Sequence, residues 1–361
     1  MSAISLPGWP AETPSVDTRL RSLWLRIFAG GFVIIIVLLL FTLFTPIPYG
    51  DLSRIGQLSE HEFGWRLPQP PIDVAHLQGA PIDKADILVI GDSYSMENVW
   101  QSRLVRAGYG VTTAFWYAFD SRLCGDFDAW IAQAGFHGKL VIIQSVERLL
   151  KERMLKTQEC ANGRNTTPLT WYAKPYYPAV RAVPGFALNW GAKLTSGLIT
   201  WNHTRQAKQP LQERDAITID KKVKVRVVPG GCQMHLFSNR LCDRALFFHE
   251  DDDNAELTPK VIEQMQAFSR AQNGVQILWV VVPDKTTTYV LPERSKDFVA
   301  ALRDSDLGPD LFSLIRKERT RITDLYFPND THLSIWGQNL LGDALLQAVR
   351  ERIGPSPGTN H

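Results

Sequence analysis

The residues with the clearest chemical potential are Gly91-Asp92-Ser93, which directly follow an apolar run. Ile87 to Ile90 are all apolar and mostly β-branched, and such a run predicts a strand that is buried on both faces. Gly91 permits a tight turn, and Met96–Ala107 is compatible with a helix that has Ser95 as its N-cap. Ser93 is therefore expected at the carboxyl end of a strand, where open α/β sheets bind ligands. A serine there can act as a nucleophile, and its backbone N–H can stabilise an oxyanion.

The histidine that could activate this serine lies near the other end of the chain, in Asp330-Thr331-His332. An aspartate two residues before a histidine can orient the imidazole ring and stabilise its charged form. Ser93, His332 and Asp330 therefore predict a hydrolase-type triad, provided that the sheet brings the two ends of the domain together. Gly-Asp-Ser alone is a common turn sequence and Asp-x-His alone is a weaker signal, so the prediction depends on their combination.

Four short motifs carry a resemblance to a known superfamily. Gly91-Asp92-Ser93 and Asp330-Thr331-His332 resemble the SGNH (GDSL-type) hydrolases, whose nucleophile lies in an N-terminal Gly-Asp-Ser and whose Asp and His lie near the C-terminus. With Val282-Pro283-Asp284-Lys285 and Asp51-Leu52-Ser53-Arg54-Ile55-Gly56, the chain more narrowly resembles the SGNH-like domain of bacterial alginate O-acetyltransferase proteins. The resemblance covers roughly residues 50–353. It implies transfer of acetyl groups to an exopolysaccharide such as alginate or acetylated cellulose.

The sequence departs from the superfamily pattern in two places. The common spacing Asp-x-x-His would put Asn329 in the place of the acid, so the acid here must be Asp330, as in the acetyltransferase branch. The Gly-x-Asn-Asp block of the superfamily is not evident, because the corresponding strand, Leu140–Ile143, continues into Gln144-Ser145. The Ser93 amide and Gln144 are therefore the candidate oxyanion donors.

Further candidates for the site lie at expected strand ends. Gly91 and Asp92 flank the nucleophile, and Gln144 and Ser145 follow a strand, so all four are candidates for the oxyanion or substrate pocket. Arg148 could bind a substrate anion or form a salt bridge inside the protein. Lys285, after the strand Val275–Val282, could hold an acidic sugar or lie on the surface.

The alternation of strands and helices predicts an α/β fold with a doubly wound, mostly parallel sheet, as in SGNH hydrolases and flavodoxin-like proteins. The length of the chain and the alternation of expected strands and helices indicate a domain at residues 85–353, with an insertion at about 151–257 where this alternation is interrupted. Further strands are expected at Val111–Phe115 and Lys222–Val227, and helices at Phe127–Gly135, Pro259–Gln272, Ser295–Arg303, Leu311–Glu318 and Ile335–Arg352. The tail 354–361 is expected to be disordered.

An uncharged apolar run, Ile27–Thr45, precedes the domain. As a helix it would extend about 28 Å, close to the thickness of the hydrocarbon core of a bilayer, so we expect one transmembrane helix. A cleaved signal peptide and a buried soluble helix are the alternatives. The basic residues within 1–26 favour a cytoplasmic tail, which would place the rest of the chain in the periplasm of a bacterium, anchored in the inner membrane. The proline-rich residues 46–84 predict an extended linker or arm.

The insertion holds two further sets of residues. Its aromatic side chains, Trp171-Tyr172, Tyr176-Tyr177, Trp190 and Trp201, are expected in the core for the most part, with one or two in contact with sugar. The acidic cluster Asp251-Asp252-Asp253 could bind calcium, although a solvated turn is the simpler expectation because the EF-hand spacing is missing.

The four cysteines lack a paired metal spacing, and their even number in an extracytoplasmic domain suggests disulfides. Cys232–Cys242 would close a short loop, which leaves Cys124–Cys160 as the other pair. A net charge of +2 gives no reason to expect nucleic acid, and there is no glycine-rich phosphate loop. We therefore expect neither a metal nor a cofactor.

Three functions are compatible with these residues. The resemblance favours a periplasmic O-acetyltransferase, with Ser93 carrying the acetyl group, an exopolysaccharide as acceptor, and a membrane-bound acyltransferase in the synthesis and export complex as acetyl donor. The alternatives are a carbohydrate acetylesterase on the same fold and a non-catalytic polysaccharide-binding subunit. Motif residues do not separate transfer from hydrolysis, since exclusion of water and binding of the acceptor decide between them.

Overall fold

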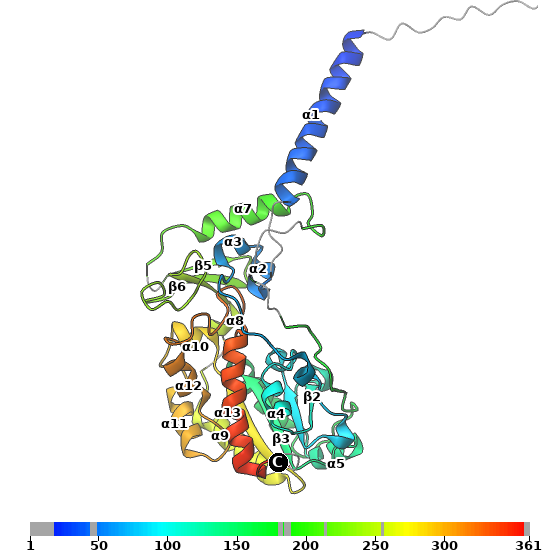
Figure 1. Ribbon diagram of the computed structural model, residues 1–361, viewed down its shortest axis with the longest axis vertical. Helices are drawn as coiled ribbons and strands as arrows, with labels where there is room; N and C mark the ends of the chain where they lie inside the picture. The colour runs from blue at the N-terminus through cyan, green and yellow to red at the C-terminus, as the bar shows by residue number, and fades with distance from the viewer. Residues whose placement is uncertain are drawn as a thin grey trace, which may run out of the picture.

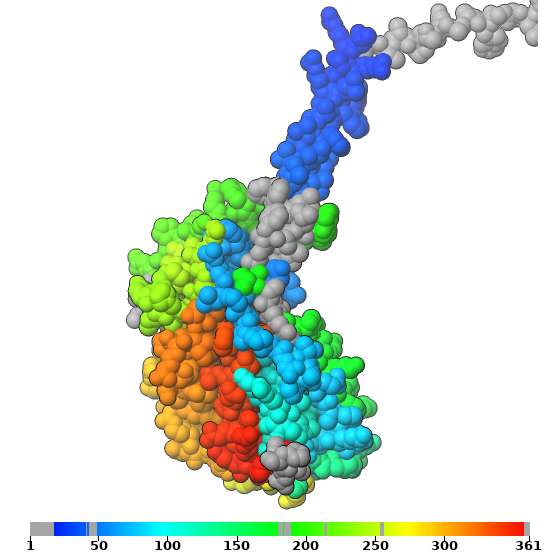
Figure 2. All heavy atoms as spheres, in the orientation of Figure 1, coloured from blue at the N-terminus to red at the C-terminus, as the bar shows by residue number. Residues whose placement is uncertain are grey.

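A computed structural model describes residues 18–43, 49–179, 183, 189–212, 215–253 and 256–356 of the 361-residue chain. Figure 1 shows a long N-terminal helix, α1 (Thr18–Leu43), that projects away from the rest of the molecule. The space-filling view in Figure 2 shows the same separation between this helix and the globular part. The catalytic candidates all lie in the globular part.

The main sheet has five strands in the order β4-β2-β1-β3-β8. Four of them are parallel: β2 (Val111–Phe115), β1 (Ile87–Gly91), β3 (Leu140–Val146) and β8 (Gln276–Val282), while the short edge strand β4 (Trp171–Tyr172) is antiparallel to β2. Nearly every residue of the four parallel strands is buried, as expected for a sheet that is covered on both faces. The predicted α/β class is confirmed, with a mixed and mostly parallel sheet.

Alternate residues of each strand enter two different apolar cores, so helices cover both faces of the sheet. Leu88 and Ile90 pack in one core, to which α5, α9 and α11 contribute, whereas Ile87 and Val89 pack in the other with α4 and α13. The bounds are α4 (Gln101–Arg106), α5 (Phe127–Gln133), α6 (Glu147–Glu159), α9 (Pro259–Ala271), α10 (Lys285–Tyr289), α11 (Lys296–Asp304), α12 (Leu311–Glu318) and α13 (Ile335–Ile353). The period-two pattern of the strands thus explains the layered architecture.

A second, antiparallel sheet forms within the predicted insertion, with β5 (Ala216–Ile219), β6 (Val223–Val227) and β7 (Arg244–Phe248) in that order. It shares a small apolar core with the segment that follows α1. Helix α7 (Ser196–Ala207) and the short helix α8 (Glu250–Asp253) complete this region. The expected strand at Lys222–Val227 is confirmed within one residue as β6.

The expectation of an extended arm at residues 46–84 is wrong for the part from residue 49 onward. This segment forms α2 (Asp51–Gly56), α3 (Glu60–Phe63) and the 3₁₀ helices η1 (Val74–Leu77) and η2 (Ile82–Lys84). Leu52, Leu58 and Phe63 are buried against Val223 and Leu246 of the second sheet. The prolines suggested an extended chain. Burial of these apolar side chains stabilises the folded segment, and an extended linker would leave them exposed to water.

Helix α1 is long and apolar enough to cross a membrane, and its side chains are exposed along the membrane-length window. It begins nine residues before the predicted start at Ile27, and residues 44 and 45 lie outside the described part. At the other end, Tyr109 donates a hydrogen bond to the Gly354 carbonyl and Ser356 donates one to the Gly108 carbonyl. The expected disorder of the tail is therefore wrong for residues 354–356, and residues 357–361 lie outside the described part.

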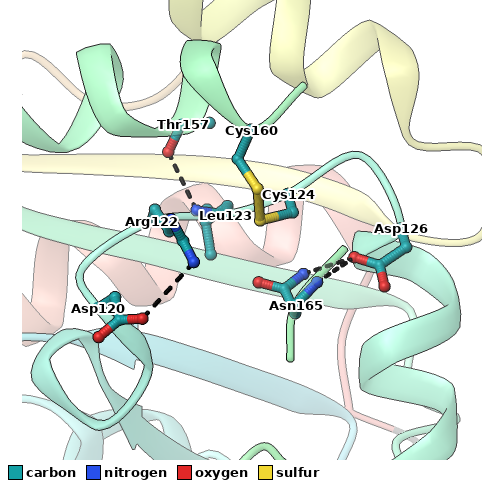
Figure 3. Close-up of a disulfide and its surroundings, with 8 residues drawn as sticks. All are labelled: Asp120, Arg122, Leu123, Cys124, Asp126, Thr157, Cys160 and Asn165. Atoms are coloured by element: carbon teal, nitrogen blue, oxygen red, sulfur yellow. Dashed lines mark hydrogen bonds and ion pairs between the residues drawn. A yellow bond between two sulfur atoms is a disulfide. The ribbon is translucent and has the colours of Figure 1, made fainter. Parts of the chain in front are cut away.

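Both expected disulfides are present. Cys124–Cys160 has an S–S distance of 2.00 Å and joins the loop before α5 to the end of α6, as Figure 3 shows. Near it, the Thr157 hydroxyl accepts a hydrogen bond from the Leu123 N–H at 3.1 Å. Cys232–Cys242 closes the loop before β7 with an S–S distance of 1.95 Å.

Candidate active site

The three predicted catalytic residues form one chain of hydrogen bonds. Ser93 Oγ lies 2.8 Å from His332 Nε2, and His332 Nδ1 lies 2.6 Å from Asp330 Oδ1. Ser93 and His332 are 239 positions apart in sequence, so only the fold brings them together. The contacts have the order and spacing of a nucleophile, a base and an orienting acid.

The nucleophile is held by a turn that Asp92 organises from inside the protein. This carboxylate accepts hydrogen bonds from the backbone N–H groups of Tyr94 and Val146, at 3.2 and 2.8 Å, and forms a buried ion pair with Arg153 at 2.9 Å. Burial alone would raise the pKa of Asp92, but the Arg153 charge and the Val146 N–H outweigh it and hold the pKa below its usual value. Asp92 therefore positions Ser93 and does not face a substrate.

Gly91 and Gln144 belong to the same support. A Cβ on Gly91 would lie 2.2 Å from the Ser95 hydroxyl oxygen, so only glycine fits there. Gln144 Oε1 accepts hydrogen bonds from the Asp92 N–H and the Ser95 hydroxyl, and Gln144 Nε2 donates to Asp92. Strand β3 runs three residues further than expected, which encloses Gln144 within the sheet. The prediction of Gln144 as an oxyanion donor is therefore wrong, because its side chain is buried. The prediction of Ser95 as a helix N-cap is also wrong, because α4 begins at Gln101.

Ser145 and Arg148 are also occupied inside the protein. The Ser145 hydroxyl accepts a hydrogen bond from Arg153 at 2.7 Å. Arg148 pairs with Asp284 at 2.8 Å and with Asp251 at 3.4 Å, which selects the internal salt bridge over a substrate contact. Burial lowers the pKa of the Arg148 guanidinium less than the two aspartates raise it, so the group stays charged.

The acidic cluster after β7 is neutralised by neighbouring basic side chains. Asp251 contacts Arg148 and accepts a hydrogen bond from Thr286 at 3.0 Å, and Asp252 pairs with Lys224 at 2.5 Å and with Arg226. Asp251 is buried and Asp252 is only partly exposed. These two aspartates form part of the packing between the sheets, so neither the calcium site nor the solvated turn describes them.

Lys285 is fully buried and donates hydrogen bonds to the loop that carries His332. Its Nζ donates to the carbonyl oxygens of Phe327, Pro328 and Leu246 at 2.6, 2.9 and 2.8 Å, and lies 3.2 Å from that of Asp330. Burial lowers the pKa of Lys285 to about 7, while a shell of carbonyl acceptors favours the charged form. Lys285 is therefore neither a surface lysine nor exposed to a substrate; it fixes the backbone before His332.

The sequence prediction missed a second carboxylate beside the histidine. Asp51, at the start of α2, places Oδ2 3.7 Å from His332 Nδ1, and its backbone N–H donates to Asp330 at 2.8 Å. Both of its carboxylate oxygens also accept hydrogen bonds from Thr331. Asp51 lies in one of the four motifs that carry the resemblance, and this motif was the signal that could have identified it. Because residues 46–84 were expected to form a linker, Asp51 was not predicted to lie in the site.

The charges around His332 favour its protonated form. Burial would lower the pKa of the imidazole, but Asp330, and to a smaller extent Asp51, raise it to about 9. Burial opposes ionisation of Asp330 too, yet the His332 charge and its hydrogen bonds hold the pKa of this carboxyl well below the usual range. Burial and repulsion from Asp330 raise the pKa of Asp51 to about 6. In its neutral form His332 is therefore a strong base for the Ser93 proton, and the two carboxylates stabilise the imidazolium that forms.

The loop between Tyr326 and Leu333 is also tied to α3. Asn329 Nδ2 donates to Glu60 Oε2 at 2.6 Å, and Glu60 Oε1 accepts hydrogen bonds from the backbone N–H groups of Tyr49 and Gly50. Burial raises the pKa of Glu60 to about 7. The Leu246 N–H of β7 donates to the Pro328 carbonyl at 2.8 Å, so the small sheet supports the same loop.

Asp51, Asp330 and His332 lie close enough to share a metal ion, with ligand atoms within 4.8 Å of one another. Their donor atoms are already engaged, since all four carboxylate oxygens accept hydrogen bonds from the protein and His332 bridges Asp330 and Ser93. This donor set fits proton transfer better than metal ligation.

The surface beside Ser93 carries exposed aromatic rings. Tyr117 contacts Met96 through its hydroxyl at 3.5 Å, and the Tyr176 N–H donates to the Met96 carbonyl at 2.8 Å. Phe115 stacks on Tyr117 and Tyr172, and Tyr176 packs edge-on against Tyr177. Tyr117, Tyr176 and Tyr177 are exposed, and this set, here called the Tyr117–Tyr177 surface, is available to a ligand. Met96, which Tyr117 and Tyr176 contact, is three positions after Ser93 in the sequence.

The backbone N–H of Ser93 is the candidate oxyanion donor. Within the described residues, no protein group accepts a hydrogen bond from it, which leaves it free for an oxyanion.

Comparison with models of known protein families gave no match, and comparisons with curated proteins and with solved structures gave none either.

Proposed function

We propose that the protein is a membrane-anchored O-acetyltransferase that uses Ser93, His332 and Asp330 to move an acetyl group onto an exopolysaccharide. The observation that carries the proposal is the continuous contact from Ser93 Oγ to His332 and on to Asp330. The order β2-β1-β3-β8 of the parallel strands is typical of flavodoxin-like sheets, and Ser93 follows β1 beside the point where the strand order reverses. Both features support an SGNH-type fold.

The geometry suggests a two-step reaction. Ser93 Oγ attacks the acetyl carbonyl of the donor while His332 Nε2 takes its proton, and Asp330 stabilises the imidazolium. The carbonyl oxygen becomes an oxyanion, which the Ser93 N–H can bind. The intermediate collapses, the donor oxygen leaves with the proton from His332, and an acetyl ester remains on Ser93. His332 then deprotonates an acceptor hydroxyl, which takes the acetyl group and regenerates Ser93.

The Tyr117–Tyr177 surface favours a carbohydrate acceptor. Aromatic rings with polar edges stack on sugar rings, and several exposed rings on one surface suit a polymer better than a small ester. The resemblance to alginate O-acetyltransferase proteins points to the same class of acceptor. It also suggests a membrane-bound acyltransferase as the source of acetyl groups, within a complex for polysaccharide synthesis and export.

The remaining features support a periplasmic catalytic domain. Helix α1 could anchor the chain, and Arg19, Arg21 and Arg26 at its N-terminal side favour a cytoplasmic N-terminus. Two disulfides in the globular part suit an oxidising compartment. The proposal therefore places the protein in a bacterial inner membrane, as a single-pass protein.

The test compares the full chain in detergent with its Ser93→Ala variant, using an aryl acetate as donor with and without a polysaccharide acceptor. The proposal predicts serine-dependent release of the aryl group and serine-dependent appearance of acetyl esters on the polymer. Release that depends on Ser93 but ignores the acceptor would identify the esterase instead. That second function has one observation in its favour, since Ser93 and His332 are both partly exposed to water.

If the Ser93→Ala variant restores acetylation of the polymer in cells that lack the protein, the catalytic proposal is wrong. A non-catalytic role in the export complex would then remain.

A further inference from the structure

Helix α7 lies across the end of α1, as Figures 1 and 2 show. The Thr42 hydroxyl in the last turns of α1 donates to the Leu194 carbonyl at 3.1 Å and lies 3.4 Å from the Lys193 carbonyl, just before α7 begins at Ser196. If α1 spans a bilayer, these contacts place the start of α7 at the level where the apolar helix leaves the hydrocarbon. Helix α7 therefore begins at the interface between lipid and water.

One face of α7 is fixed to the protein. Gly197, Thr204 and Ala207 are buried, and the Thr204 hydroxyl accepts a hydrogen bond from the Ser59 N–H at 3.1 Å. The His203 ring contacts the Gly56 carbonyl at 2.7 Å. These contacts hold α7 on the layer formed by α2 and α3, so its orientation follows that of the domain.

The side of α7 next to this packed face presents apolar side chains to the outside. Leu198 and Trp201 are 46% and 53% exposed, and Leu194, one turn earlier, is 39% exposed. Leu198 and Trp201 are three residues apart and so lie along one side of the helix, and Leu194 lies in the turn just before it. Trp190, just before them, is 80% exposed. Single exposed apolar residues are common, but four within twelve positions, beside a membrane-length helix, indicate an interaction surface.

The charges near this face fit an anionic surface. Residues 189–212 contain no aspartate or glutamate, and their basic residues are Lys193, Arg205 and Lys208, of which Lys208 pairs with Glu62 of α3 at 3.0 Å. The Arg205 guanidinium lies 5.0 Å from the centre of the Trp201 ring. A tryptophan and an arginine stacked at the edge of an apolar row are typical of helices at the headgroup level, where the ring is buried and the cation meets phosphate.

We propose that α7 is an interfacial helix, whose Leu198 and Trp201, together with Leu194 just before it, insert into the headgroup boundary of the bilayer that α1 spans. Lys193 and Arg205 then meet anionic lipid headgroups. Two attachments, α1 across the bilayer and α7 along its surface, restrict the tilt and rotation of the globular part. Because α7 is packed on α2 and α3, and α2 carries Asp51, the candidate active site is held at a fixed height above the lipid. The inference is independent of the proposed chemistry.

The test places one fluorophore on this face in the full-length protein. The four native cysteines are paired, so a single cysteine introduced as Leu198→Cys can be labelled with an environment-sensitive dye. Leu155→Cys on α6 is the matched control, because Leu155 is 44% exposed and lies outside the α7 region. Both proteins are reconstituted into vesicles of phosphatidylcholine and phosphatidylglycerol that contain a lipid with a nitroxide on its acyl chain.

The proposal predicts that the label at position 198 is quenched at least threefold more strongly than the label at position 155. Adding Trp201→Glu to the Leu198→Cys protein should reduce this quenching toward the control, since Trp201 is exposed and its replacement leaves the packed face intact. Equal quenching at both positions would overturn the proposal. Self-quenching that rises with the protein-to-lipid ratio, without quenching by the nitroxide lipid, would assign the face to a second copy of the chain and also overturn it.

Discussion

The two halves of the candidate active site are held in different ways. The nucleophile follows a buried central strand, and the groups that fix its turn, such as Asp92, Gln144 and Arg153, lie within about 60 residues of it and belong to the same sheet and its helices. The base lies on the loop between Tyr326 and Leu333, which depends on residues from remote segments.

These remote contacts come from three parts of the chain. Asp51 and Glu60 belong to the segment that follows α1, Lys285 to α10 after the last strand of the main sheet, and Leu246 to the small sheet. The base is thus positioned by segments that lie far from its own loop in the sequence. Substitutions at residues that never touch a substrate should therefore impair the base more readily than the nucleophile.

The largest loss of activity should follow Ser93→Ala. Removal of the nucleophile of a triad is expected to lower kcat by about 10⁶-fold. Little change in stability is expected, because within the described residues the Ser93 hydroxyl has a hydrogen bond only with His332. Hydrolysis of an aryl acetate measures the loss and thermal unfolding measures the stability. Ser95→Ala is the control, since it keeps the nucleophile and should retain activity within about tenfold. Similar losses in both variants would show that the turn, and not the Ser93 hydroxyl, is what matters.

Asp330→Asn should give the next largest effect, about 10⁴-fold in kcat, because an amide does not stabilise the imidazolium and can select the wrong tautomer. Asp343→Asn, on an exposed part of α13, tests whether loss of a carboxylate as such is harmful. If the Asp330 variant keeps more than a tenth of the activity, another group must orient His332, and Asp51 is the candidate.

Lys285→Met should separate positioning from chemistry. It leaves the carbonyl oxygens of the base loop without their donor, and each buried unsatisfied group costs about 1–3 kcal/mol. We expect a loss of about 3 kcal/mol or more in unfolding free energy and about 10²-fold in activity, measured by denaturant unfolding and aryl acetate turnover. Lys139→Met, an exposed lysine, is the matched control. An unchanged stability would contradict the role assigned to Lys285.

The activity should rise with pH through about 9, because His332 must be neutral to accept the serine proton and its pKa is about 9. Between pH 7 and 9 kcat/KM should increase by about 50-fold, since the neutral fraction of His332 rises from about 1% to about one half. The stability should respond in the opposite direction. The raised pKa makes the His332 contribution fully present below about 6.5 and lost as the pH rises through about 9. A flat profile over this range would contradict the charge pattern at the base.

Asp51→Asn should have the smallest effect, a rise of at most about tenfold in kcat/KM at pH 7, because a lower pKa leaves more of His332 neutral. The asparagine keeps an acceptor for Thr331 but removes a negative charge 3.7 Å from His332 Nδ1. The inflection of the pH profile should therefore move below 9, which a purely structural role would not cause. An unchanged inflection would show that Asp330 alone sets the pKa of the histidine.

The sequence predicted the features that local patterns encode. Apolar runs identified the four parallel strands, and the two ends of the triad were found from Gly91-Asp92-Ser93 and Asp330-Thr331-His332. The length of β3 was not predicted because Gln144 and Ser145 are polar, and nothing in their neighbourhood shows that Asp92 and Arg153 satisfy them. Asp51 and Lys285 were misjudged for the same reason, since contacts with distant segments decide their burial.

The central claim is that His332 and Asp330 activate Ser93 as a nucleophile. The most direct test treats the full chain with a fluorophosphonate, which reacts covalently with activated serines, and locates the adduct by mass spectrometry. We predict an adduct on the peptide that contains Ser93, absent in Ser93→Ala and strongly reduced in His332→Asn. An adduct-free protein, or labelling of Ser93 that does not change when His332 is replaced, would contradict the claim.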